Sequence, residues 1–343
     1  MKALILKEYN KLVYEDFPEP RIGAEEVLIR VKACGICGSD VHGLDGSTGR
    51  RIPPIVMGHE ASGVIEAVGA EAGDLRPGER VTFDSTIYCG RCVYCREGRV
   101  NLCDNRRVIG VSCEEYRQDG AFAEYVAVPS HSVYRIGDNV SFEQAATVEP
   151  LSVALHAASR VKLPADATAL VLGAGMIGLL IVQVLKARGC AKVYAVDLDP
   201  GRLELARSLG AEEGLRPDHT NIPAEILERT EGRGADIAFD AVGLAATLTA
   251  GVNCLKKGGA LVLVGNFSPE AGLPLQRTVV RELTLYGSCA SAGEYPECLE
   301  LLASGAVKVE PLISACAPLS EGAAWFRRLY NAEKGLLKVC LLP

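Results

Sequence analysis

The sequence predicts an α/β protein in which a β-rich part is joined to a doubly wound parallel sheet. Two hydrophobic patterns along its 343 residues support this. Up to about residue 140, short apolar runs such as 27–31, 63–69 and 121–128 are separated by glycine and proline turns, as in a small barrel or sandwich. From about residue 168, apolar strands without polar alternation follow one another with helices between them. That pattern is typical of a parallel sheet covered by helices on both faces.

Each expected element has a local signal. The pair Pro77-Gly78 predicts a turn before a further strand, and Ser141, followed by Glu143 and Gln144, predicts a helix start. The alternating part should contain strands at 169–172, 192–197, 236–240 and 260–265 and helices at 176–188 and 200–209. After about residue 290 we expect an amphipathic helix at 296–304 and a final strand at 338–342.

The composition argues against several classes of function. A net charge of −7 and a pI of about 5.5 do not suit a nucleic-acid or anionic-membrane partner. No apolar run reaches the roughly 20 residues of a membrane span, and the N-terminal run is too short for a signal peptide. We therefore expect a soluble, cytoplasmic protein.

The thirteen cysteines do not resemble a disulfide framework, because no export signal precedes them. Five of them have the spacing of metal ligands. The other eight, among them Cys113, Cys190, Cys254 and Cys340, are expected to be small buried hydrophobic residues.

The segment Gly173-Ala174-Gly175-Met176-Ile177-Gly178 predicts a dinucleotide site. It follows an apolar strand, opens a helix and is followed 24 residues later by Asp197 at a strand end. Glycines let the backbone approach a pyrophosphate, and Asp197 would accept hydrogen bonds from ribose hydroxyls, which favours NAD over NADP. Arg202 weakens that preference, because an arginine can pair with a 2′-phosphate. The alternative is a glycine-rich turn without a ligand. The predicted cofactor-binding residues are Gly173, Gly175, Met176, Ile177, Gly178, Asp197, Arg202, Val242 and Gly265.

Four cysteines within 15 residues, Cys89, Cys92, Cys95 and Cys103, predict a structural zinc site. Four thiolates can surround one zinc ion tetrahedrally and leave no open position. Nearby arginines, among them Arg96, can offset the negative charge of such a centre. The alternatives are an iron–sulfur cluster and a set of redox thiols.

A second candidate metal site combines Cys37 with His59 and Glu60. A thiolate, an imidazole and a carboxylate are zinc ligands, and three protein ligands with an open position are typical of a catalytic zinc. Neighbouring residues on a strand point to opposite faces, so His59 and Glu60 can bind one metal only if the backbone turns at Gly58. Alternatively, His59 is a core histidine and Glu60 a surface charge, or Cys34 and Cys37 form a redox pair. The redox reading would require a βαβ unit rather than a β-rich segment.

In this order and spacing, the motifs resemble those of the zinc-dependent medium-chain dehydrogenases over nearly the whole chain. The segment 148–157, Val-Glu-Pro-Leu-Ser-Val-Ala-Leu-His-Ala, is similar to that of the polyol branch, which includes sorbitol, L-iditol and galactitol-1-phosphate dehydrogenases. The resemblance implies a GroES-like catalytic domain over 1–152 and 290–343, with a structural zinc lobe at about 86–106. It also implies a Rossmann cofactor domain over 153–289, an active-site cleft at the junction of the domains, and a homodimer or homotetramer.

The resemblance further implies roles for the site residues. The expected reaction is the reversible oxidation of a secondary alcohol of a polyol or sugar alcohol to a ketone, with hydride transfer to NAD. Cys37, His59 and a glutamate would bind the catalytic zinc, and both Glu60 and Glu149 are candidates for that glutamate. Ser39 and His42 would pass the hydroxyl proton to solvent through the cofactor ribose, so the predicted catalytic residues are Ser39, His42 and Glu60.

Some positions differ from those of sorbitol dehydrogenases. These enzymes have an aromatic residue where this chain has Gly43, and an Arg-Tyr pair where it has Cys289-Ala290, so we expect a wider and less polar pocket. Arg50 and Arg51 either dock a phosphorylated sugar or belong to a solvated loop. Alternative activities are those of L-threonine and 2,3-butanediol dehydrogenases. The alternative of another class is a non-catalytic nucleotide-binding protein.

Overall fold

The computed structural model describes all residues from Met1 to Pro343, which form two compact units. Unit 1 contains residues 1–149, 292–304 and 309–343, and unit 2 contains residues 150–291 and 305–308. The chain first passes from unit 1 to unit 2 inside helix α4 (Val148–Ser159), so a helix and not a flexible linker carries this boundary.

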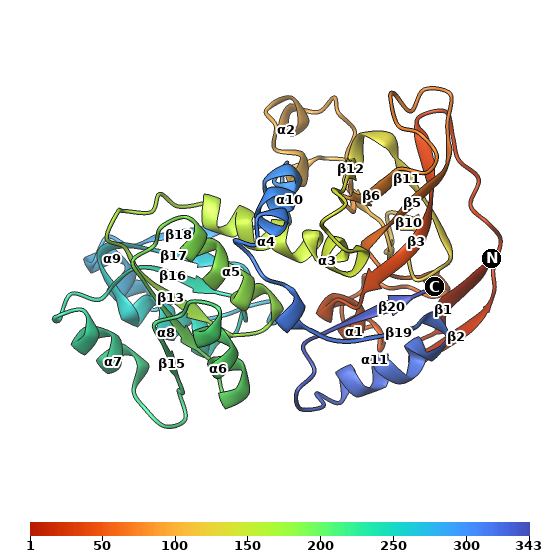
Figure 1. Ribbon diagram of the computed structural model, residues 1–343. Coiled ribbons are helices and arrows are strands. Elements are labelled where there is room, and N and C mark those ends of the chain that lie inside the picture. Colours follow the sequence, from red (N-terminus) through yellow and green to blue (C-terminus); the bar gives the residue numbers. More distant parts are fainter. The chain divides into compact units, whose positions relative to one another are not determined.

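Unit 1 is mainly β-structure, as predicted (Figure 1). Its strands are β1 (Lys2–Glu8), β2 (Lys11–Asp16), β3 (Glu26–Gly35), β4 (Ile55–Val56), β5 (Glu60–Val68), β6 (Arg80–Phe83), β7 (Thr86–Ile87), β8 (Arg107–Val108), β9 (Val111–Ser112), β10 (Arg117–Gln118), β11 (Tyr125–Pro129), β12 (Val133–Arg135), β19 (Ile313–Pro318) and β20 (Lys338–Leu342). Its helices are α1 (Gly38–Gly43), α2 (Val93–Arg96), α3 (Phe142–Ala146), α10 (Tyr295–Ala303) and α11 (Gly322–Tyr330), with single 3₁₀ turns at 100–102, 130–132, 310–312 and 319–321.

The main sheet of unit 1 brings the two ends of the chain together. Its strand order is β12-β6-β5-β3-β20-β19, and β11 also pairs with β3. The C-terminal strand β20 pairs antiparallel with β3, with Cys340 opposite Gly35. The segment that begins at Lys338 therefore lies beside the segment that carries Cys37. Apolar side chains from β1, β3, β5, β11, β20 and α11 form one buried core around this sheet.

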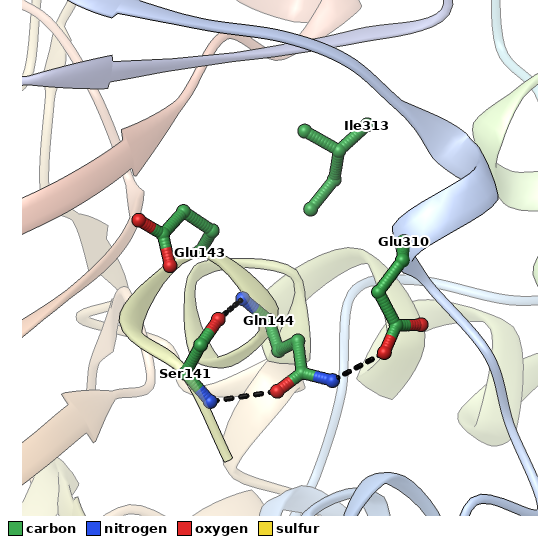
Figure 2. Close-up of a pocket in the computed structure, with 5 residues that line it drawn as sticks. All are labelled: Ser141, Glu143, Gln144, Glu310 and Ile313. Carbon is green, nitrogen blue, oxygen red and sulfur yellow. Dashed lines mark hydrogen bonds between the residues drawn. The ribbon is translucent and has the colours of Figure 1, made fainter.

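The predicted helix start at Ser141 is confirmed by its hydrogen bonds. The Ser141 hydroxyl accepts from the Gln144 backbone N–H at 3.1 Å, and the Gln144 side chain accepts from the Ser141 N–H at 2.6 Å. This reciprocal pair is a capping box. Figure 2 shows it beside a hollow of about 410 Å³ lined by Ser141, Glu143, Gln144, Glu310 and Ile313. No predicted site residue lines that hollow.

Unit 2 contains the alternating strands and helices that the sequence predicts. Its strands are β13 (Thr168–Leu172), β14 (Lys192–Val196), β15 (Glu213–Leu215), β16 (Ala235–Asp240), β17 (Leu255–Leu263) and β18 (Thr284–Gly287). Besides most of α4, its helices are α5 (Met176–Ala187), α6 (Pro200–Ser208), α7 (Ile222–Arg229), α8 (Ala245–Cys254) and α9 (Leu275–Val280).

The six strands of unit 2 form one parallel sheet in the order β15-β14-β13-β16-β17-β18. Counted along the chain this is the order 3-2-1-4-5-6 of doubly wound dinucleotide-binding folds. Every residue of β13 is buried, which explains why its sequence shows no polar alternation. The strand order reverses between β13 and β16, and ligands of such folds bind outside the carboxyl ends of the strands at that point.

The cysteine and membrane predictions have separate outcomes. All thirteen cysteines are free thiols. Cys190, Cys254 and Cys340 are buried as predicted, but Cys113 is only half-buried and both Cys289 and Cys316 are exposed, so the general prediction of burial is wrong for these three. No helix is both long and apolar enough to cross a membrane. The cytoplasmic location stays a prediction.

Candidate metal and cofactor sites

The structure brings Cys37, His59 and Glu60 together in unit 1. Their ligand atoms lie within 4.8 Å of one another. Cys37 is the residue before α1, and Glu60 is the first residue of β5. Gly58 has a φ of 97°, and a Cβ atom there would lie 2.8 Å from the Phe122 backbone nitrogen. Only glycine accepts this conformation without strain, so Gly58 provides the turn that lets His59 and Glu60 face one point.

A buried carboxylate lies behind the imidazole of His59. Asp40 is fully buried, and its Oδ1 lies 3.5 Å from His59 Nδ1. Histidines that bind metals commonly hold one ring nitrogen against a carboxylate and present the other to the metal. Burial by itself lowers the pKa of His59, but the charges of Asp40 and Cys37 outweigh it and hold that pKa well above its usual value. A thiolate, an imidazole and a carboxylate together form a donor set that fits a zinc ion.

Lys338 is a buried cation that the sequence did not identify. It is 3% exposed, and its Nζ donates to Glu60 Oε2 at 2.5 Å and to the Ile36 carbonyl at 3.0 Å. The antiparallel pairing of β20 with β3 places it there. Burial opposes its charge, but Glu60 outweighs burial and raises the pKa of Lys338 above its usual value. The only available signal was a lysine at the start of an otherwise apolar final strand.

Arg51 contradicts both predictions made for it. It is 3% exposed, so it does not belong to a solvated loop, and its guanidinium group faces Asp40 and is not available to a phosphate. Its Nε and Nη2 donate to Asp40 Oδ1 at 3.0 and 2.8 Å, and Nη2 also donates to Ser39 Oγ at 3.3 Å. A Cβ atom on Gly43 would lie 2.3 Å from Arg51 Cγ. Arg51 therefore fills the space at Gly43 that was expected to widen the pocket.

The remaining predicted residues of this region lie near the cluster or on α1. Glu149 is outside the close group of three ligands, at the start of α4. Burial is the main cause that raises its pKa to about 7, while the charge of His59 opposes this and that of Glu60 adds to it. Ser39 and His42 are three positions apart on α1 and hence on the same face of that helix. Both Ser39 and His42 are exposed.

The four cysteines of the lobe form a second cluster in unit 1. The Sγ atoms of Cys89, Cys92, Cys95 and Cys103 all lie within 4.8 Å of one another. The Cys89 and Asn105 backbone N–H groups each lie 3.3 Å from Cys103 Sγ. Backbone N–H groups of Arg91 and Cys92 are the main cause that lowers the pKa of Cys89 to about 6. Four convergent thiols with backbone donors favouring the thiolate form fit a closed zinc site.

The fingerprint glycines of unit 2 differ in their surroundings. Gly173 has a φ of 90°, and a Cβ atom there would lie 2.5 Å from Val242 Cγ2. A Cβ atom on Gly178 would lie 1.8 Å from the Gly173 carbonyl oxygen, so this glycine permits close packing of α5 on the turn. No atom lies within 4 Å of a Cβ atom on Gly175. This open position at the start of α5 is where a pyrophosphate would approach the backbone.

The other predicted cofactor residues gather at the carboxyl ends of the strands. Asp197 follows β14, and its carboxylate accepts from the Ala174 N–H at 2.7 Å and from the Asp199 N–H at 2.9 Å. Val242 follows β16 and lies against Gly173. A Cβ atom on Gly265 would lie 2.3 Å from the Val242 carbonyl carbon, so these residues are also adjacent. Arg202 lies in the first turn of α6, the helix that follows Asp197 in the chain, and is half-buried.

Two family models match the chain. The alcohol dehydrogenase GroES-like domain matches residues 23–138. The zinc-binding dehydrogenase model matches residues 177–304. The first match covers both cysteine clusters, and the second begins within the glycine fingerprint.

Individual proteins are similar to this chain over its full length. A sorbitol dehydrogenase of Bacillus subtilis (strain 168) is 35% identical, and the match covers 100% of this chain and 97% of that protein. The crystal structure of a zinc-binding dehydrogenase from Sinorhizobium meliloti 1021 bound to NADP has a TM-score of 0.92 and 32% identity, covering 100% of this chain and 99% of the other. An alcohol dehydrogenase from Escherichia coli CFT073 complexed with NADH has a TM-score of 0.93 and 32% identity, with the same coverage.

Proposed function

This chain belongs to the zinc-dependent medium-chain dehydrogenases, and we propose that it oxidises a secondary alcohol of a polyol or sugar alcohol to a ketone, reversibly, with hydride transfer to NAD. The observation that carries this proposal is the convergence of Cys37, His59 and Glu60 in a chain that matches a sorbitol dehydrogenase from end to end. A thiolate, an imidazole and a carboxylate leave a position free for a substrate oxygen.

In this proposal Cys37 and His59 hold the catalytic zinc, and Glu60 or Glu149 completes the protein ligands. When bound, zinc supplies a Lewis acid that lowers the pKa of a coordinated hydroxyl group. Glu60 forms a buried ion pair with Lys338. Glu149 is buried and has a pKa raised to about 7, mainly by burial. Cys89, Cys92, Cys95 and Cys103 hold the structural zinc.

Ser39 and His42 are proposed to move the proton that the substrate hydroxyl loses. Ser39 and His42 share one face of α1 and both are exposed to solvent, which supports this role. A hydroxyl group can donate and accept a proton, and a histidine titrates near neutral pH. A proton taken up near Ser39 could thus leave the protein at His42.

Unit 2 is proposed to bind the dinucleotide, and unit 1 to carry the chemistry. The nicotinamide supplies the hydride acceptor when the cofactor is bound. Gly175 leaves space at the start of α5, and Asp197 lies at the end of β14 where a ribose would lie. Relatives have been crystallised with NADP and with NADH, so we base the preference for NAD on Asp197.

We also propose a homo-oligomer that assembles through unit 2. Strand β18 lies at the edge of the sheet, and its outer backbone groups have no neighbouring strand. On the adjacent helix α9, Leu275, Val279 and Val280 are 65%, 64% and 68% exposed. Apolar side chains at an open sheet edge suit an interface with a second copy. Light scattering should give a dimer or tetramer that Val280→Glu weakens, and a wild-type monomer would refute this part of the proposal.

A substrate screen tests the enzymatic part. The holoenzyme is mixed with NAD or NADP and a panel of polyols that includes sorbitol, xylitol and L-iditol, and NADH or NADPH formation is followed by absorbance. We expect turnover with at least one polyol, faster with NAD, and none with Cys37→Ser. Full activity in Cys37→Ser, or no turnover with any polyol, would overturn the proposal.

A further inference from the structure

We propose that Arg51 is a positioning residue of the catalytic zinc site, which holds Asp40 in place behind His59 and orients the hydroxyl group of Ser39. This inference rests on the proposed function, because it assigns the zinc to Cys37 and His59. It adds a residue from a segment that carries none of the metal-binding motifs.

The contact between Arg51 and Asp40 is buried and has two hydrogen bonds. The two side chains are 4% and 0% exposed. Both Arg51 Nε and Arg51 Nη2 donate to Oδ1, which is also the Asp40 oxygen nearest to His59 Nδ1. Asp40 Oδ2 points toward the backbone N–H of Cys37, at 3.4 Å. Arg51 therefore fixes the oxygen that faces the imidazole, and the same carboxylate contacts the segment of a second ligand.

The charge of Arg51 explains why Asp40 can remain ionised without solvent. A fully buried carboxylate is costly unless a cation and hydrogen bonds compensate it. The fork of a guanidinium group can make two bonds to one carboxylate and still reach a third group, which the single ammonium of lysine cannot do in the same geometry. With Asp40 held in this way, its Oδ1 stays beside His59 Nδ1, which leaves Nε2 as the ring nitrogen that can bind the metal.

The contact with Ser39 connects the zinc ligands to the predicted proton pathway. Arg51 Nη2 lies 3.3 Å from Ser39 Oγ. A guanidinium group can only donate, so the Ser39 oxygen accepts this bond and its own proton must be donated elsewhere. Arg51 thus selects the hydroxyl orientation in which Ser39 is a donor. A nearby positive charge also favours the deprotonated form of a group that releases a proton.

The protein provides a specific place for this side chain. Gly43 lacks the Cβ atom that would lie 2.3 Å from Arg51 Cγ. Arg51 Nη1 donates to the Arg50 carbonyl at 2.9 Å, and its backbone forms a bridge with Ser112. Arg50, the preceding residue, is exposed. The pair therefore offers a matched comparison in which one arginine touches the site and its neighbour faces solvent.

Arg51→Gln and the control Arg50→Gln are compared as holoenzymes. Each variant loses one positive charge, and only the first loses the contacts to Asp40 and Ser39. Zinc transfer to a chromogenic chelator is followed without substrate. We expect the zinc held by Cys37 and His59 to leave Arg51→Gln about 10-fold faster than the wild type. Partners of metal ligands commonly contribute 10- to 100-fold to metal affinity. In the pH profile of kcat for polyol oxidation, the apparent pKa of the acidic limb should rise by about one unit in Arg51→Gln. Arg50→Gln should match the wild type in both measurements.

Two further variants separate positioning from general damage. Gly43→Ala keeps both charges but takes the space of the Arg51 side chain, so it should reproduce the faster zinc release even if Arg51→Gln does not fold. Arg51→Lys keeps the charge but not the fork and should recover part of the zinc retention. Zinc release and a pH profile equal to those of Arg50→Gln in the folded Arg51→Gln, or wild-type behaviour of Gly43→Ala, would overturn the proposal. The chelator measurement needs no turnover, so absence of polyol oxidation would refute the proposed function and leave this test intact.

Discussion

The two cysteine-containing clusters of unit 1 stabilise their thiols in different ways. In the lobe, Cys89, Cys92 and Cys95 are half-buried, and backbone N–H groups donate to the sulfurs. In the second cluster, Cys37 lies beside the buried residues His59 and Glu60. The Asp40 carboxylate lies next to His59, and the Lys338 ammonium group pairs with Glu60. One set of ligands comes from 15 consecutive residues, and the other comes from the residue before α1, the turn before β5 and the first residue of β5.

This difference corresponds to the different tasks of a closed and an open metal site. A closed site of four thiolates needs only a local chain path that brings four sulfurs together. An open site must keep carboxylates charged and correctly oriented while substrate and product exchange. Asp40 with Arg51 and Glu60 with Lys338 provide these compensating charges. Replacing a metal ligand in the lobe should therefore affect stability first, and replacing a metal ligand in the open cluster should affect activity first.

Replacing one cysteine in each cluster gives the largest expected effects. Cys103→Ser should lower the Tm by roughly 10 °C or more, because a structural zinc contributes folding free energy and 1 kcal/mol corresponds to about 2–4 °C in a domain of this size. Cys37→Ser should lower kcat/KM by more than about 100-fold with little change in Tm, because even partners of metal ligands contribute 10- to 100-fold. Calorimetry measures the Tm and polyol oxidation measures kcat/KM. If both variants lost stability and activity to the same extent, the comparison between the sites would be wrong.

Lys338→Met tests whether the open cluster depends on its compensating charges. The substitution leaves Glu60 buried without its cation, which should cost roughly 3–5 kcal/mol in the free energy of unfolding. Lys334→Met is the control, because Lys334 is exposed and only four positions away. Urea denaturation of both holoenzymes measures the difference. Equal stability of the two variants would mean that Glu60 does not need Lys338.

The sequence predicted what is local in both clusters and missed what arrives from a distance. Cys89 to Cys103 form a site within one short segment, so their spacing alone was sufficient. The turn at Gly58 was also predictable, since two neighbouring ligands require it. Lys338 reaches Glu60 through the pairing of β20 with β3, and no local pattern specifies which strands pair.

Arg51 was misjudged for a related reason. Its neighbourhood is rich in glycine and polar residues, which usually indicates a solvated loop. The Arg51 side chain is buried because Gly43 has no Cβ atom in its way and because the buried Asp40 carboxylate requires a cation beside it. Neither condition can be recognised from the local sequence. In unit 2, by contrast, the alternation of strands and helices predicts a parallel sheet, and the glycine fingerprint after its first strand predicts where the site lies.

Asp84 offers a test with a smaller effect, at a position that influences both clusters. It is 4% exposed, and burial is the main cause that raises its pKa to about 6. Its charge acts on Glu149 beside the open cluster and on Tyr88 beside the lobe. Between its unfolded pKa near 4 and its folded pKa, the folded state binds more protons, so stability falls as the pH rises through this range. The full difference is about 3 kcal/mol.

Asp84→Asn should therefore be more stable than the wild type at pH 7, and this advantage should disappear as the pH falls from about 6 to about 4. Asparagine can still accept the bond that the Thr86 N–H donates to Asp84 at 2.8 Å. Asp138→Asn is the control, because the Asp138 side chain is fully exposed. Thermal unfolding at several pH values measures the effect. An advantage that does not vary with pH would assign the stability difference to another cause.

The smallest expected effect concerns the arginines around the lobe, which the sequence suggested as compensation for its negative charge. Arg96 is exposed and donates only to the Arg91 carbonyl, at 2.9 Å, so water screens its charge. Arg96→Gln should change the free energy of unfolding by less than about 1 kcal/mol and leave zinc retention unchanged. Arg51→Gln is the comparison, because it removes the same charge from a buried site. A loss of lobe zinc in Arg96→Gln would show that this closed site also depends on charged side chains, and that backbone N–H groups are not sufficient for it.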